Sequence, residues 1–402
     1  MADNHLTRQQ IYDRIRESSR DEYILEEMKR LGFWNKNESS PTLPELLIKK
    51  ESNLHKELNA LLAEKQKFQN REALLKEMRL KRMEATKLKR EDNKKKKEKE
   101  RFEKTTAWRK KQETEIFYLG EEVSAGLHYA ENNHPLLNQK ALPVFENEQQ
   151  LALAMNCTVK ELAFLAFSRR VSELTHYQKF YLPKKSGGKR LISAPMPRLK
   201  KAQHWILQTI LYKIPLHTSA NGFVPTKSIV SNAWPHTGKQ VVINMDIKDF
   251  FPSISFRRVR ALFKNLGYSD KIATILALLC TEAPTEQVEL DGKKYFVQKG
   301  ERVLPQGAPS SPAITNILCY RLDKRLVGVA NKFNGTYTRY ADDITISGSF
   351  AHNTATRIVW QIKKILSEEG FILHPEKIRI MQQSQRQEVT GIVVNQEMSV
   401  NR

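Results

Sequence analysis

The sequence has few cysteines and no long apolar run. Its three cysteines, Cys157, Cys280 and Cys319, lie far apart in 402 residues. They indicate neither a disulfide framework nor a zinc site, so we expect three buried, reduced thiols. No apolar stretch approaches the ~20 residues that cross a bilayer, and the N-terminal MADNHLTRQQ lacks the apolar core of a signal peptide. These absences predict a cytoplasmic protein with no membrane partner.

Acidic residues are also scarce relative to basic ones. They number 45 against 67 lysines and arginines, which gives a formal net charge of +22. Such an excess favours a polyanionic partner, with nucleic acid as the first candidate and an anionic membrane surface as the second. The length allows two or three domains with a sizeable core, so the chain is large enough to be an enzyme.

Proline and glycine are absent from residues 45–119, which consist mostly of strong helix formers. This composition predicts one long helix or two joined helices. Before it, residues 7–34 predict one or two short amphipathic helices that end at Gly32, with Phe33 and Trp34 as anchors.

The two halves of the long helical segment differ. The first half has an apolar residue at every seventh position, namely Leu47, Leu54, Leu61, Phe68 and Leu75. This row has two explanations. It forms a coiled coil that joins the chain to a second copy or to an effector protein, or it packs along the helix's own domain. The second half, residues 79–111, has 16 lysines and arginines against 6 acids, a net +10. It is either a solvated helix or a rod that follows nucleic-acid phosphates.

A globular region follows Gly120. Residues 180–211 predict a strand, a turn with two glycines, a second strand and a helix. Lys184, Lys189 and Arg190 crowd this turn, where basic groups can clamp a triphosphate. A solvated basic turn is the alternative.

The stretch QVVINMDIKDFFPSI, residues 240–254, predicts a buried central strand that ends at Asp246. Burying a lone carboxylate costs several kcal/mol unless it is paired or bound to a metal. We therefore expect a cation beside Asp246. Asp249 is interpreted as a turn or helix-start residue and not as a ligand.

The stretch TRYADDITIS, residues 338–347, predicts a hairpin with Asp342 and Asp343 in the turn. Two adjacent carboxylates raise each other's proton affinity. If the strand of Asp246 pairs beside this hairpin, three carboxylates meet at an oxygen site that suits magnesium. Two ions about 3.5–4 Å apart would then serve nucleotidyl transfer. An ordinary aspartate-rich turn is the alternative.

Together these motifs resemble the palm of a reverse transcriptase. NMDIKDFFPSI, LPQGAPSSPAITNILCYRLDKRL and YADD occur in that family's order within residues 116–395. In addition, NAWPH at 232–236 and VTG at 389–391 match the NAxxH and VTG motifs of retron reverse transcriptases. The resemblance implies an RNA-directed DNA polymerase that uses two Mg²⁺ ions, dNTPs, a noncoding RNA template-primer and an RNA-DNA hybrid.

The resemblance also implies an α+β right-hand polymerase fold. Its expected parts are a small helical segment with a linker (1–43), the long basic helix or coiled coil (44–115), fingers with part of the palm (116–240), the palm (241–388) and the start of a truncated or absent thumb (389–402). We expect the helical N-terminal extension to replace part of the thumb's grip on nucleic acid, through residues 79–111.

The family pattern assigns roles to individual residues. Asp246 and Asp342 would bridge the magnesium ions, and Asp343 would complete the acidic site. Phe251 matches the aromatic steric gate that excludes a ribose 2′-hydroxyl, with core packing as the alternative. Lys377 lies where polymerases keep a proton donor for pyrophosphate, although a solvated lysine also explains it.

The remaining assignments concern the nucleotide and the RNA. Lys184 and Arg190 match the phosphate clamp, with Lys189 as a further candidate. Gln306 and Gly307 would approach the incoming nucleotide, carried by a helix over residues 312–326 with Pro312 in its first turn.

For NAxxH, an RNA contact and a structural insert remain equal interpretations. The RNA candidates are Asn232, Trp234, His236, Val389, Thr390 and Gly391, with the last three opening the thumb. The resemblance further implies priming from an RNA 2′-hydroxyl and phage defence with an effector protein. Two rivals stay open: a prokaryotic reverse transcriptase of abortive-infection or intron-encoded type, and an RNA-binding scaffold that has lost catalysis.

Overall fold

The computed structural model describes residues 7–34, 41–129, 131–183 and 187–400. Contacts between residues divide the chain into two units, 1–106 and 107–402. Within the described ranges, every helix is either too short or too polar to cross a membrane.

Short helices with clear caps begin the first unit. α1 (Arg8–Glu17) and α2 (Arg20–Leu31) are the two helices predicted for residues 7–34. The Ser19 hydroxyl accepts the backbone N–H of Glu22 at the start of α2, and Gly32 ends the helix with a left-handed φ of 81°. The predicted anchoring by Phe33 is wrong, because 77% of this residue is exposed.

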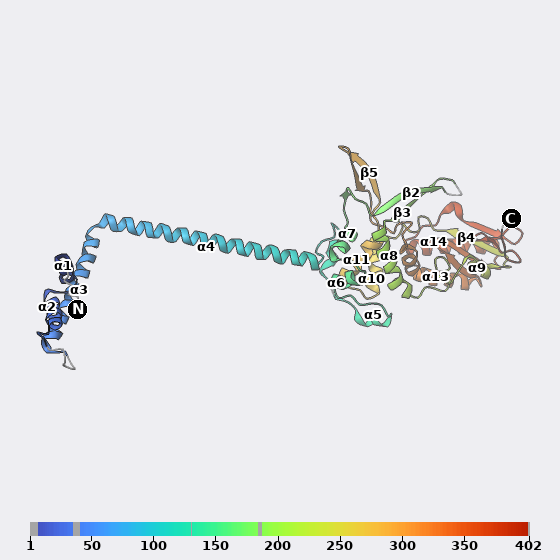
Figure 1. The fold of residues 1–402 in the computed structure, drawn as a ribbon. Helices are drawn as coiled ribbons and strands as arrows, with labels where there is room; N and C mark the ends of the chain where they lie inside the picture. The colour runs from blue at the N-terminus through green and yellow to red at the C-terminus, as the bar shows by residue number, and fades with distance from the viewer. Residues whose placement is uncertain (1–6, 35–40, 130, 184–186, 401–402) are drawn as a thin grey trace. The chain divides into compact units, whose positions relative to one another are not determined.

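Two joined helices follow, as the lack of proline and glycine predicts. α3 (Leu43–Gln69) and α4 (Arg71–Thr114) meet at Asn70, and the latter continues into the second unit (Figure 1). α3 contacts α2 through polar groups: Lys29 pairs with Glu45 at 2.5 Å, and Ser52 donates to Glu22.

The apolar row on α3 and α4 does not pack against the described part of the chain. Between 45% and 67% of each of its residues is exposed: Leu47, Leu54, Leu61, Phe68 and Leu75. Packing along its own domain therefore does not explain this row in the structure. The basic segment of α4, residues 79–111, is exposed along its length.

A four-stranded antiparallel sheet forms the centre of the second unit, in the order β7-β8-β4-β9. Its strands are β4 (Val241–Asp246), β7 (Thr336–Tyr340), β8 (Asp343–Gly348) and β9 (Arg379–Gln382). The run of Val241, Val242 and Ile243 is buried, and β4 lies between β8 and β9, so the predicted central strand is confirmed.

Helices enclose the main core on one side of this sheet. α10 packs against α11, and α13 against α14 (Figure 1). The five helices after β4 are α10 (Phe256–Asn265), α11 (Asp270–Cys280), α12 (Ser311–Leu318), α13 (Tyr320–Lys332) and α14 (His352–Glu368). All three cysteines are free; Cys280 and Cys319 are buried as predicted, whereas Cys157 is only half-buried.

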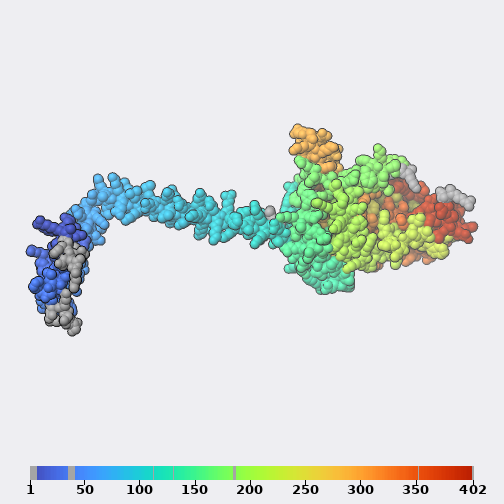
Figure 2. Space-filling view, in the orientation of Figure 1, coloured from blue at the N-terminus to red at the C-terminus, as the bar shows by residue number. Residues whose placement is uncertain are grey.

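Two hairpins rise from the same side of the second unit (Figure 1). The first, β2 (Tyr177–Pro183) with β3 (Lys189–Pro195), confirms the predicted strand-turn-strand, and α8 (Pro197–Thr209) follows it. The second, β5 (Thr285–Leu290) with β6 (Lys293–Gln298), has no counterpart among the predictions. It stands out from the surface in Figure 2 (orange) and pairs with β1 (Val171–Ser172).

Short elements complete the unit. Before β4 they are η1 (Ser124–His128), α5 (His134–Gln139), α6 (Glu148–Ala154), α7 (Val159–Ala166), η2 (Leu211–Lys213), α9 (Ile229–Ala233) and η3 (Trp234–His236). After α14 they are η4 (Pro375–Lys377), β10 (Glu388–Val389), β11 (Ile392–Val393) and β12 (Ser399–Val400).

The last described residues form a small sheet, and their assignment to the start of a thumb stays a prediction. β10, β11 and β12 pair antiparallel, with Thr390 and Gly391 forming a two-residue turn at φ values of 48° and 85°. Val389 and Ile392 pack with Val242 of the central strand in a second, smaller core. Within VTG, Val389 therefore ends β10, and Thr390 with Gly391 forms the turn of the hairpin. This hairpin covers the other face of the palm sheet.

Candidate active site

Three aspartates lie at one end of the palm sheet. Asp246 is the last residue of β4 and is paired in register with Asp343, the first residue of β8. The expected pairing of the Asp246 strand beside the hairpin is thus confirmed. The turn consists of Ala341, with a φ of 56°, and Asp342. The prediction that both adjacent aspartates occupy the turn is wrong, because Asp343 already belongs to β8.

The proximity of these carboxylates raises their proton affinity. Desolvation by the surrounding protein, followed by the charge of Asp246, raises the pKa of Asp342. The pKa of Asp343 rises to about 7, through desolvation and then the charges of Asp342 and Asp246. A bound cation would relieve this repulsion. The electrostatics therefore fit a metal site of oxygen ligands, which is the donor set that magnesium takes.

Lys377 supplies a positive charge at this position. Its Nζ lies 2.8 Å from Oδ2 of Asp246, and its charge offsets part of the rise in the pKa of Asp342. Among the residues that the structure describes, no group of three or more His, Cys, Asp or Glu is arranged to hold a metal ion. The ammonium group of Lys377 contacts one oxygen of Asp246, Oδ2, and would compete with a metal ion for that oxygen.

A buried polar network holds the turn in place, and no motif in the sequence indicated it. Arg339 in β7 and Asp323 in α13 are both fully buried; Nε and Nη2 of Arg339 donate to the two oxygens of Asp323 at 2.8 Å. Tyr337 also donates to Asp323, at 2.7 Å. Arg339 Nη1 donates to Oδ1 of Asn316 at 3.0 Å and to the carbonyl of Ala341 at 3.1 Å. The network therefore fixes the backbone beside Asp342.

An open groove of about 1530 Å³ runs past the aspartates. The predicted site residues that line it are Asp246, Asp342, Lys377, Lys189, Arg190, Phe251, Gln306 and Gly307. The charge of Arg190 is close enough to offset part of the rise in the pKa of Asp342. Lys184 lies outside the described residues. Asp343 does not line the groove, and its side chain keeps contact with solvent, so the protein around it desolvates it only in part.

The loop before α12 is fastened to the β2–β3 hairpin. The Ser193 N–H donates to the carbonyl of Gln306 at 2.8 Å. Gly307 has a φ of 124°, and a Cβ there would lie 2.8 Å from Cγ2 of Ile192 and 3.0 Å from the carbonyl oxygen of Ser193. Glycine is thus required by contact with β3, a reason that the sequence did not indicate.

The helix after this loop is not continuous. Pro312 lies in the first turn of α12 as predicted, but the single helix over 312–326 is wrong. The helix is interrupted at Cys319, whose ψ of −2° departs from the helical value, and α13 begins at Tyr320. This break places Asp323 on a separate helix that faces the buried Arg339.

Comparisons with known proteins agree with the motifs. The family described as "Reverse transcriptase (RNA-dependent DNA polymerase)" matches residues 182–394. The chain is 42% identical over 301 residues to the retron Mx162 reverse transcriptase of Myxococcus xanthus, covering 70% of this chain and 61% of that protein. It is 32% identical to the retron Ec86 reverse transcriptase of Escherichia coli, covering 65% and 75%. The chain belongs to the retron reverse transcriptases.

These proteins are related over part of their length. This retron family member spans 61% and 62% of the Mx162 and Mx65 relatives from M. xanthus. Among solved structures, it is similar to telomerase from Candida albicans with a fragment of telomeric RNA (12% identity, TM-score 0.41, 56% of this chain and 46% of that one). It is also similar to a foamy viral protease-reverse transcriptase with double-stranded DNA (16%, 0.33, 58% and 32%).

The NAxxH motif of this retron family member is largely internal. Asn232 and His236 are fully buried. His236 bridges two strands of the palm, with ring nitrogens 2.6 Å from Ser347 Oγ and 2.8 Å from Thr338 Oγ1. Burial lowers its pKa to about 3, so the imidazole is neutral at physiological pH.

The two retron motifs meet in space. Asn232 Nδ2 donates to Thr390 Oγ1 of VTG at 3.4 Å. The burial of Asn232, His236 and Val389 favours a structural insert, although it braces the palm and not the fingers. An RNA contact stays a prediction for the exposed Trp234 and Gly391 and for the half-buried Thr390.

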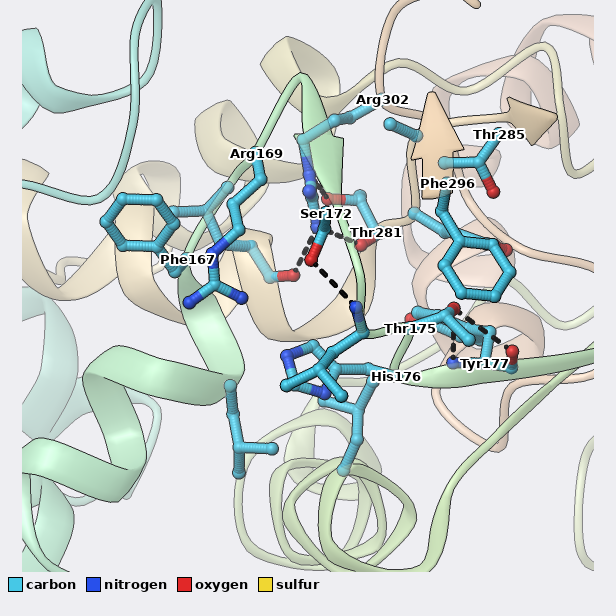
Figure 3. Close-up of a pocket in the computed structure, with 16 residues that line it drawn as sticks. Phe167, Arg169, Ser172, Thr175, His176, Tyr177, Thr281, Thr285, Phe296 and Arg302 are labelled. Carbon is cyan, nitrogen blue, oxygen red and sulfur yellow. Dashed lines mark hydrogen bonds between the residues drawn. The ribbon is translucent and has the colours of Figure 1, made fainter. Parts of the chain in front are cut away.

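A second cavity lies at the base of the β5–β6 hairpin and holds about 80 Å³ (Figure 3). Arg302 crosses it and donates to the carbonyls of Leu278 and Thr281. The backbone N–H of Tyr177 donates to Thr175 Oγ1 at 3.2 Å. These polar groups are therefore satisfied within the wall of the cavity.

Proposed function

We propose that this chain copies an RNA template into DNA by nucleotidyl transfer at the aspartate end of the groove. The observation that carries the proposal is the register pair of Asp246 and Asp343 beside Asp342, at a groove that basic and aromatic side chains also line. The family membership supplies the reaction class, and the groove supplies the position for the 3′ end and the incoming dNTP.

The donor set fits two Mg²⁺ ions, held by Asp246 and Asp342 with Asp343 completing the acidic site. When bound, magnesium would activate the attacking hydroxyl and stabilise the leaving pyrophosphate. Arg190 and Lys189 extend from β3 into the same groove, where their charges can hold the triphosphate. Gln306 and the backbone of Gly307 line the same groove and would contact the nucleotide.

Lys377 is proposed to protonate the leaving pyrophosphate. Its ammonium group already lies within 2.8 Å of Asp246, so a proton is stored beside the position where negative charge develops. Phe251 lines the groove and the neighbouring Phe250 is buried, which supports Phe251 as the steric gate against a 2′-hydroxyl.

The finer activity follows from the retron family. We propose a noncoding RNA as template and primer, synthesis that begins at an RNA 2′-hydroxyl, and a role in phage defence with an effector protein. The exposed basic segment of α4 is proposed to hold the RNA or the RNA-DNA product. The exposed apolar row on α3 and α4 is proposed for assembly with a second copy or the effector.

Primer extension on an RNA template tests the activity. With Mg²⁺, the native chain should extend a DNA primer, and Asp342→Asn should lower the rate at least about a thousandfold, since metal stabilisation supplies several kcal/mol. Asp291→Asn is the matched control, because Asp291 lies in the exposed turn of the β5–β6 hairpin. Equal rates for Asp342→Asn and the native chain would refute the assignment.

Priming is tested separately. Nucleic acid purified with the chain from cells should contain RNA joined covalently to DNA, and the junction should be at a 2′-oxygen. DNA synthesis in vitro without such a joined product in cells would refute 2′-hydroxyl priming and leave the polymerase assignment intact.

A further inference from the structure

Phe223 has an unusual conformation for an aromatic residue. Its φ of 58° lies in the left-handed region, which bulky side chains rarely adopt. The residue is 53% exposed, and it lines the groove together with Asp246 and Asp342. An exposed apolar ring on a left-handed backbone contributes little to folding, so this arrangement calls for another explanation.

The loop before Phe223 is attached to the aspartate turn. The Asn221 N–H donates to the carbonyl of Arg339 at 2.7 Å. Asn316 Nδ2 donates to the carbonyl of Gly222 at 2.8 Å. A Cβ on Gly222 would lie only 2.4 Å from the backbone nitrogen of Ala341. The same elements that hold Asp342 therefore hold the backbone of Phe223.

The ring of Phe223 faces the proposed gate. Its centroid is 6.3 Å from that of Phe251, with the rings tilted by 58°. The centroid of Phe251 is in turn 5.7 Å from that of the buried Phe250. Phe251 therefore contacts one aromatic ring from the core and another from the groove.

We propose that Phe223 is a positioning residue for sugar selection, which acts by holding the ring of Phe251. This inference rests on the proposed role of Phe251 as the steric gate. A ring excludes a 2′-hydroxyl only if it cannot move aside, and a half-buried ring is free to move toward any side that lacks packing. Phe223 supplies packing on the groove side, and its attached backbone keeps it there.

The discrimination between dNTPs and rNTPs tests this proposal. The ratio of kcat/KM values for the two nucleotides is measured for the native chain, Phe223→Gly, Phe251→Ala and the double variant. Phe223→Gly removes the ring and tolerates the left-handed backbone, so the loop is retained. Trp360→Ala, at an exposed aromatic residue of α14 outside the groove, is the control.

Phe223→Gly should lower the discrimination ratio about tenfold, chiefly by increasing rNTP incorporation, as expected from the loss of one aromatic pair. Because Phe223 acts through Phe251, the double variant should show the ratio of Phe251→Ala alone. Trp360→Ala should keep the native ratio.

If Phe223→Gly lowered kcat/KM equally for dNTPs and rNTPs, the inference would be overturned, because such a loss would indicate a general role such as stacking on the template. The inference would also be overturned if the double variant lowered the discrimination ratio by the product of the two single effects. If Phe251→Ala keeps the native ratio while DNA synthesis continues, both the gate and its support are refuted. Failure of the proposed function is distinguishable, because the native chain would then make no DNA at all.

Discussion

The buried pair of Arg339 and Asp323 offers the clearest test of how the aspartate turn is held. Both side chains are fully buried, and Asp323 accepts three hydrogen bonds, two from Arg339 at 2.8 Å and one from Tyr337 at 2.7 Å. Asp323→Ala leaves the guanidinium group without its carboxylate. Removing one partner of a buried ion pair costs about 3–5 kcal/mol, because an uncompensated charge remains.

Urea unfolding of the full chain measures this cost through tryptophan fluorescence. Four of the five tryptophans, Trp108, Trp205, Trp234 and Trp360, lie in the second unit. Asp323→Ala should lower the free energy of unfolding by about 3–5 kcal/mol. It should also reduce primer extension, since Arg339 holds the carbonyl of Ala341. Glu286→Ala, which breaks an exposed pair with Lys299, is the control and should cost at most about 1 kcal/mol.

A double variant separates charge from packing. Arg339→Met with Asp323→Leu removes both charges, and replacing a buried pair by apolar residues is often close to neutral. The double variant should therefore recover most of the stability but not the activity. A cost below about 1 kcal/mol for Asp323→Ala, or a double variant no more stable than the single one, would refute the reasoning.

Three further predictions concern other parts of the chain. The pKa of His236 is about 3 in the folded chain and 6.5 in its ordinary state, so the imidazole stays neutral when folded. The free energy of unfolding should therefore fall as the pH drops below 6.5, by about 2 kcal/mol at pH 5. The variant His236→Gln should not show this loss when its stability is measured across the same pH range. Gly222→Ala should impair folding and primer extension, because the added Cβ clashes with Ala341. Gly328→Ala is the control, since a Cβ there meets nothing within 4 Å, and it should be as stable as the native chain in urea unfolding. Replacing the four lysines at 94–97 by glutamine should weaken RNA binding and reduce the slope of log K against log salt by up to about 3; an unchanged slope in filter binding would contradict a phosphate contact.

Local patterns predicted the parts of the fold that depend on neighbouring residues. The apolar run before Asp246 and the alternation after Asp343 determine strands, and glycines 187 and 188 determine a turn, because each depends on a few adjacent side chains. The β5–β6 hairpin had a usable pattern as well. Asp291 and Gly292, with φ values of 50° and 72°, separate two short alternating segments, which is typical of a two-residue hairpin turn.

The contacts of the site could not be predicted from the sequence where segments far apart in the chain meet. The contact of Gly307 with Ile192 depends on the docking of a loop onto β3, and no local pattern records it. The same holds for His236, whose partners lie more than 100 residues away. Arg339 lies in TYTRY and Asp323 in YRLDKRLVGVANK, which are polar segments, so no local pattern distinguished this buried pair from solvated charges.

The central strand belongs to two hydrophobic cores at once. Val241, Ile243 and Met245 of β4 join the main core, whereas Val242 joins the small one with Val389 and Ile392. A boundary between palm and thumb drawn at residue 389 would therefore cut through a packed interface. A protein shortened at that point would uncover Val242 and remove the Thr390 hydroxyl that accepts from the buried Asn232, so the palm itself would lose stability.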